Sequence, residues 1–125
     1  MLANLALLFV LGLVAGSFLG VLAVRLPKRG PVILARSACP HCGHELTASE
    51  LIPVISWIVQ RRRCRTCEAK LSVFYPTIEL AAAAIAVASG GLFSGFWIVA
   101  GCVAGWAVLA LAAWRFSNSG SDATL

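Results

Sequence analysis

The chain has 125 residues, of which 60% are hydrophobic and only 12% are charged, and its formal net charge is +5 at pH 7. A soluble domain of this length cannot bury so much apolar surface, because small domains leave a large part of their surface exposed to water. The composition therefore excludes an ordinary soluble domain and indicates a membrane protein.

The first predicted element is a membrane-spanning helix at residues 2–24, where no charged residue occurs. About 20 apolar residues in a helix suffice to cross a bilayer. The segment is too long for a signal-peptide core and lacks a clear cleavage site, so we expect it to be retained. Gly12, Gly16 and Gly20 recur every four residues with Ser17 beside them, which favours close packing against another helix of the chain.

A basic loop at residues 25–73 follows the first span and holds nine of the ten Lys and Arg residues. An excess of Lys and Arg beside membrane spans marks the cytoplasmic side. Contact with anionic lipid headgroups then explains the positive charge, and we expect no nucleic acid partner.

Two Cys-x-x-Cys pairs lie in this loop, separated by 21 residues: Cys39 with Cys42, and Cys64 with Cys67. Thiolates at this spacing can complete a tetrahedron around one Zn²⁺. A cytoplasmic loop is in a reducing compartment that disfavours disulfides. The prediction is a structural zinc site with four protein ligands and no open position for a substrate.

The residues around the cysteines suggest how the loop turns. Gly43 can take the positive φ that follows the first pair, whereas Glu68 stands at the corresponding position of the second pair. His41 and His44 are alternative ligands, although solvent-facing roles suit them better. The neighbouring arginines offset thiolate charge or anchor the loop to the membrane surface; they are Arg61, Arg62, Arg63 and Arg65.

The apolar segment at residues 51–59 lies between the two pairs and is too short to cross a bilayer. Pro53 interrupts any helix there. One interpretation is a re-entrant or interfacial segment with Trp57 at headgroup depth. The other is the apolar side of the metal ribbon packing on itself.

Two more spans are predicted at residues 74–89 and 91–114, joined by a tight turn at Gly90-Gly91 and followed by a polar tail at residues 115–125. Cys102 lies within the last span and suits a small packing role. The prediction is a single all-α membrane domain over residues 1–125. It has three transmembrane helices, and a cytoplasmic tetracysteine zinc-ribbon loop connects the first two.

Three spans place the loop and the C-terminus on one side of the membrane, with the N-terminus outside. Glu79 lies near the cytoplasmic end of the second span, where a carboxylate is costly and is a candidate functional residue. The alternative is a structural acid at the positive end of a helix.

Several short motifs follow one another along residues 12–85. They are Gly-Ser-Phe-Leu at 16–19, Arg-Leu-Pro at 25–27, Cys-Pro-His-Cys-Gly at 39–43, Ile-Pro-Val-Ile-Ser-Trp at 52–57, Cys-Arg-Thr-Cys at 64–67, Tyr-Pro at 75–76 and Glu-Leu at 79–80. This order resembles the N-terminal domain of the prepilin peptidases, the bifunctional type IV leader peptidase and N-methyltransferase enzymes.

The chain departs from the family pattern at Gly20, where Asn is usual, at Phe74, where a basic residue is common, and at Glu68, where Gly is usual. The family also cleaves the prepilin leader with two aspartates, whereas this sequence holds only Asp122, in its polar tail. An aspartic dyad needs two coupled carboxylates. We therefore expect no leader cleavage by this chain alone.

The resemblance implies an enzyme of the bacterial inner membrane that serves type IV pili or type II secretion. It would methylate the N-terminus of mature pilin or pseudopilin with S-adenosylmethionine, and Glu79 and Glu50 are the candidate catalytic acids, since Glu45 and Glu68 adjoin the cysteines. The alternative is a non-catalytic, zinc-stabilised membrane scaffold or fragment that binds pilin precursors or a separate peptidase subunit.

Overall fold

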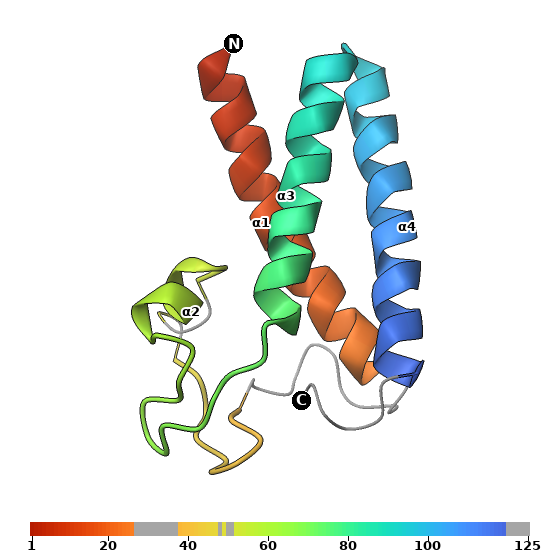
Figure 1. Ribbon diagram of the computed structural model, residues 1–125. Helices are drawn as coiled ribbons and strands as arrows, with labels where there is room; N and C mark the ends of the chain where they lie inside the picture. Colours follow the sequence, from red (N-terminus) through yellow and green to blue (C-terminus); the bar gives the residue numbers. More distant parts are fainter. Residues whose placement is uncertain (27–37, 48, 50–51, 120–125) are drawn as a thin grey trace.

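Four helices form the described part of the chain in this computed structural model, which describes residues 1–26, 38–47, 49 and 52–119 (Figure 1). They are α1 (Leu2–Arg25), α2 (Ile55–Val59), α3 (Phe74–Leu92) and α4 (Phe96–Ser119). The described residues contain no strand, only two isolated β-bridges. Helices α1, α3 and α4 are each long and apolar enough to cross a membrane, which confirms the predicted all-α membrane fold.

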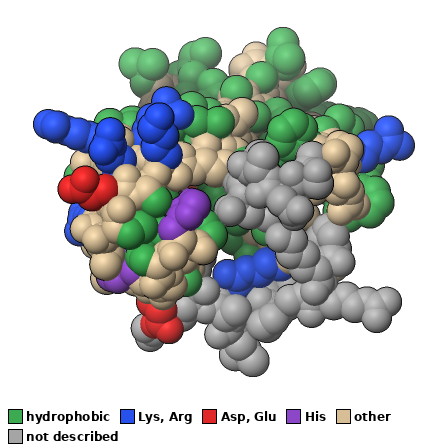
Figure 2. All heavy atoms as spheres, turned by 60° about the horizontal axis from the view of Figure 1, so that its bottom comes forward, with side chains coloured by type: hydrophobic (Ala, Val, Ile, Leu, Met, Phe, Trp, Pro, Cys, Tyr) green, Lys and Arg blue, Asp and Glu red, His purple; other side chains and the backbone are tan. Residues whose placement is uncertain are grey.

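The three long helices form one bundle, and the described part of the loop between α1 and α3 lies at one end of it (Figure 1). Helix α1 crosses α3, and α4 runs antiparallel to α3. The N-terminus and the α3–α4 connection lie at one end of the bundle, whereas α2 and the ends of α1 and α4 lie toward the other. Viewed from that second end, Lys and Arg side chains gather beside His and acidic side chains (Figure 2).

The glycine stripe of α1 allows the close contact between α1 and α3. A Cβ atom at Gly12 would overlap the Cα atom of Ala83, and one at Gly16 would lie 2.6 Å from the Cα atom of Glu79. Gly20 faces an aromatic ring of α3. Backbones can approach this closely only where side chains are absent, so the predicted packing within the chain is confirmed.

Gly16→Ala is therefore expected to destabilise the bundle by about 1–3 kcal/mol, because an added methyl group overpacks the contact between α1 and α3. Gly91→Ala is the matched control: it lies in α3 with no atom within 4 Å of the added Cβ, and alanine favours the helix by up to ~1 kcal/mol. Thermal unfolding in detergent micelles, followed by circular dichroism, measures both. Equal unfolding temperatures for the two variants would contradict this packing.

The predicted turn at Gly90-Gly91 is wrong, because α3 continues through both residues to Leu92. The connection lies just beyond, where Gly95 has a φ of +56°. Gly90 instead serves packing, since a Cβ atom there would overlap the side chain of Leu8 in α1. Glycine is tolerated within a helix when a neighbour needs the space.

Helix α4 packs along α3 through few polar contacts and extends further than predicted. The indole Nε1 of Trp106 donates a hydrogen bond of 3.0 Å to the carbonyl oxygen of Ala82. Cys102 is 6% exposed, in agreement with a packing role. The helix runs on to Ser119, whose hydroxyl donates to the carbonyl of Arg115, so the first part of the predicted polar tail is helical.

Candidate metal centre

Each Cys-x-x-Cys pair sits in the same kind of backbone turn. In the first turn, the Gly43 amide donates to the carbonyl of Cys39, and the Cys39 amide donates to the carbonyl of His44, both at 2.9 Å. The second turn repeats this pattern, with the Glu68 amide donating to the carbonyl of Cys64 at 3.0 Å. The two loops thus present their cysteines in the same way.

The four sulfur atoms converge, with every pair within 4.8 Å. The Sγ atoms of Cys39 and Cys67 are 3.8 Å apart, and so are those of Cys42 and Cys64. Sulfurs on a tetrahedron with Zn–S bonds of about 2.3 Å are about 3.8 Å apart. All four thiols are free, so this donor set fits one tetrahedral metal ion.

The backbone of the second turn prepares its buried sulfur for metal binding. Amide hydrogen bonds from Cys67 and Thr66 stabilise the Cys64 thiolate and lower its pKa to about 6. The His44 amide acts in the same sense at Cys42, but desolvation and the neighbouring sulfurs outweigh it and raise the pKa to about 12. A bound cation reverses such repulsion among sulfurs and favours all four thiolates.

The histidines take no part in the cluster. Among the described residues, the group of side chains that could hold a metal contains only the four cysteines. His41 is exposed. The sequence-based preference for four sulfur ligands over the two histidines agrees with this geometry.

Glu68 has a φ of +56°, as the glycine at the corresponding Gly43 does at +71°. A side chain in this left-handed region costs roughly 1–2 kcal/mol. Glu68→Gly is therefore expected to retain metal about fivefold better against a competing chelator, since ~1 kcal/mol corresponds to about that factor. Glu68→Ala is the control, because it removes the carboxylate but keeps the Cβ atom. An equal gain in metal retention in both variants would show that the effect comes from the lost charge and not from the backbone conformation.

Glu79 joins the loop to the bundle through a contact that the sequence does not reveal. Its Oε2 atom accepts a hydrogen bond of 2.7 Å from the backbone amide of Val54, and the side chain of Ser17 in α1 is a further hydrogen-bond partner. Glu79 is only 6% exposed. Val54 has a φ of +56°, which is strained for a β-branched residue. No local pattern signals this contact, because 25 positions separate the two residues.

The other candidate acid, Glu50, lies outside the described residues. Glu45 and Glu68 are exposed on the two cysteine turns, which agrees with setting them aside. Among the three acids that the structure describes, Glu79 is the one within a membrane helix and against the loop.

The segment around α2 exposes its apolar side chains, with Ile55, Ile58 and Val59 each more than half exposed. The structure therefore favours the interfacial interpretation over a segment packed inside the metal ribbon. Trp57 ties α2 to the start of α3, because its Nε1 atom donates to the carbonyl oxygen of Ser72 at 3.2 Å. Its ring also lies under the Arg62 guanidinium, 5.3 Å from the centroid.

Comparison with known proteins identifies relatives over most of the chain. The family model "Bacterial Peptidase A24 N-terminal domain" matches residues 10–93. Three relatives share the name "Prepilin leader peptidase/N-methyltransferase". The Myxococcus xanthus protein is 51% identical over 58% of this chain and 22% of its own length. The Bacillus subtilis protein is 40% identical over 69% of this chain and 35% of its own length. The Aeromonas hydrophila protein is 35% identical over 85% of this chain and 45% of its own length.

The chain thus spans less than half the length of these curated relatives. No solved structure matches it. The match covers α1 from residue 10 onward, the tetracysteine loop and α3. These parts contain the four cysteines and Glu79. The chain belongs to the bacterial peptidase A24 N-terminal domain family.

Proposed function

We propose that this chain is the N-terminal module of a prepilin leader peptidase/N-methyltransferase and that it methylates the N-terminal amine of mature pilin or pseudopilin. The observation that carries the proposal is the buried carboxylate of Glu79, held in a membrane helix beside the tetracysteine loop. A carboxylate at such a position is costly and marks a functional site. The names of the relatives supply the reaction class.

Methylation requires a neutral amine aimed at a methyl donor. S-adenosylmethionine, when bound, supplies the methyl group, and its sulfur keeps the electron pair of the broken bond. The amine reaches the membrane border as an ammonium ion, and Glu79 pairs with it there. The carboxylate accepts the proton that nitrogen must lose before it can attack. Glu50, as the second candidate acid, assists from the loop in this proposal.

The metal in this proposal is zinc, and its role is structural. Four thiolate ligands leave no position for a substrate or an activated water. The four cysteines hold the two turns together, and Val54 and Trp57 connect the intervening segment to α3. A stable loop then keeps the substrate amine aligned with the carboxylate of Glu79.

The proposed location is the bacterial inner membrane, with the loop and the end of α4 in the cytoplasm and the N-terminus outside. The exposed arginines near the cysteines support this orientation. Reporter fusions at Met1 and Ser117 test it: we expect only the Ser117 fusion to report a cytoplasmic position. A periplasmic Ser117 would contradict the orientation.

A second candidate is a non-catalytic scaffold that binds pilin precursors or a separate peptidase subunit. Helix α4 offers such a partner a contact surface within the membrane, because apolar side chains such as Trp97, Val103 and Leu111 are not covered by the rest of the bundle. Mass spectrometry of a pilin N-terminus separates the two functions, because only the enzyme changes the mass of its substrate.

A further inference from the structure

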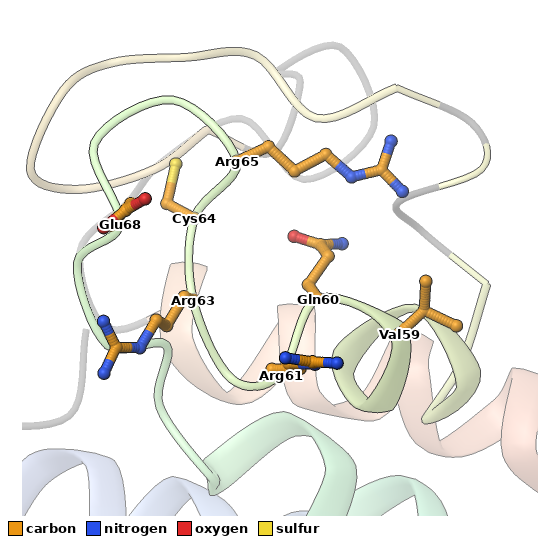
Figure 3. Close-up of a pocket in the computed structure, with 7 residues that line it drawn as sticks. All are labelled: Val59, Gln60, Arg61, Arg63, Cys64, Arg65 and Glu68. Atoms are coloured by element: carbon orange, nitrogen blue, oxygen red, sulfur yellow. The ribbon is translucent and has the colours of Figure 1, made fainter.

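The turn after α2 forms a basic cavity that the proposed reaction does not use. The cavity has a volume of about 670 Å³. Figure 3 shows its lining side chains, which come from the end of α2 and from the second cysteine turn. They are Val59, Gln60, Arg61, Arg63, Cys64, Arg65 and Glu68. Three guanidinium groups and one apolar side chain thus surround one opening, with a single carboxylate at its side.

The backbone holds these arginines in a fixed arrangement. The amides of Arg61 and Arg62 donate to carbonyl oxygens of α2, and that of Arg63 donates to the carbonyl of Gln60, the residue that ends the helix, all at 3.0–3.1 Å. Arg61 and Arg62 have φ values of +51° and +61°. Two consecutive non-glycine residues in the left-handed region are strained, and such strain concentrates at functional sites.

The arginine side chains of the strained turn lie in different places. Arg62 lies over the Trp57 ring and does not line the cavity, whereas Arg61 and Arg63 on either side of it do. No carboxylate of the described residues forms an ion pair with Arg61 or Arg63. Both guanidinium groups therefore keep their capacity for an anion, and arginine binds phosphate oxygens with paired N–H donors.

The cavity also lies at the height where a membrane surface is expected. Val54, at the start of the α2 segment, contacts Glu79, which is five residues into α3 and thus about 8 Å along its axis. Trp57 contacts Ser72, just before α3 begins. The cavity follows α2 directly, so it lies near the border of the span, beside the exposed Ile58 and Val59.

We propose that this cavity binds the headgroup of an anionic phospholipid. The lipid phosphate lies between the guanidinium groups of Arg61 and Arg63, and its acyl chains run along the exposed apolar face of α2. A soluble anion would gain nothing from that apolar face, whereas a lipid buries it. The site would fix α2 at the membrane surface and so hold the loop against the bundle.

Two double variants, matched in charge and backbone, test this site. Arg61→Gly with Arg63→Gln removes the two guanidinium groups of the cavity. Arg62→Gly with Arg115→Gln removes two positive charges elsewhere. Each double variant places glycine at one position with a positive φ, so the backbone strain of the turn changes equally in both. Native mass spectrometry of the full chain in detergent, with equal amounts of dioleoylphosphatidylglycerol and dioleoylphosphatidylcholine, counts the lipid that each protein retains.

We expect the wild type and the control to retain one phosphatidylglycerol per chain with a preference of about tenfold or more, since each arginine near the surface adds roughly a fivefold factor. The cavity variant should lose that preference. Equal loss in both variants would assign the effect to diffuse charge and overturn the proposal, as would no preference in the wild type. Displacement of the lipid by an equal concentration of inorganic phosphate would also overturn it, because the site would then take a soluble anion.

A third double variant, Arg61→Lys with Arg63→Lys, tests the site if the cavity variant fails to fold, because it keeps both positive charges. Lysine lacks the paired N–H donors of arginine. An undiminished preference for phosphatidylglycerol in this variant would contradict binding of the phosphate by paired N–H groups.

Discussion

Replacing Cys64 with serine is expected to release the metal and unfold the loop while α1, α3 and α4 remain helical. In the described part of the loop, the buried hydrophobic side chains are those of Cys39 and Cys64, each 3% exposed. Such a loop has almost no apolar core of its own. Binding of a structural zinc to a small peptide supplies roughly 10–16 kcal/mol, so a zinc ion held by the four cysteines would be the main source of the loop's stability.

Elemental analysis of the purified protein measures this effect directly. We expect about one zinc per wild-type chain, since one tetrahedral site holds one ion, and a large loss in Cys64→Ser. Cys102→Ser is the control, because it removes the fifth cysteine, which lies in α4 outside the cluster. A chelator should mimic Cys64→Ser, whereas a reductant should have no effect. Purified protein with two disulfides and no metal would contradict this result.

Glu79→Gln is expected to lower methylation of a mature pilin by about 100-fold or more, which is the usual contribution of a positioned general base. Glutamine keeps an oxygen that can accept the hydrogen bond from Val54, but it has no negative charge and cannot take up a proton. The loop should therefore stay attached to α3 while the reaction fails. Glu79→Ala should lose both the attachment and the activity.

The attachment of the loop to α3 can be measured separately from activity through Trp57, which lies in the same segment as Val54. Its fluorescence should be unchanged in Glu79→Gln and altered in Glu79→Ala; the other tryptophans are common to both variants. Glu68→Gln, at an exposed acid of the cysteine turn, controls for loss of charge and should methylate normally. Full activity in Glu79→Gln would show that Glu79 only positions the loop.

The spans and the clustering of the four cysteines could be predicted from the sequence because both depend on local composition or spacing. An uncharged stretch as long as residues 2–24 requires a membrane, and Cys-x-x-Cys spacing brings two sulfurs together within one turn. The stripe of Gly12, Gly16 and Gly20 could be predicted for the same reason, since a period of four marks one helix face.

What could not be predicted depends on contacts between distant residues. Gly90 looks like a turn residue but makes room for Leu8, which lies on another helix. Whether α2 faces lipid or the ribbon depends on how the loop folds back onto α3. The hydrogen bond between Val54 and Glu79 likewise forms only when the loop folds back onto α3. The sequence alone therefore could not show whether Glu79 is an isolated acid within the membrane or one that holds the loop.

The most direct test of the proposed function is mass spectrometry of a mature pilin N-terminus after incubation with this protein and S-adenosylmethionine. We expect the N-terminal peptide to gain the mass of one CH2 unit with the wild type, because a methyl group replaces a hydrogen, and to stay unchanged with Glu79→Gln. An N-terminus that stays unmethylated with zinc-loaded, folded wild-type protein would contradict the methyltransferase function and favour the scaffold.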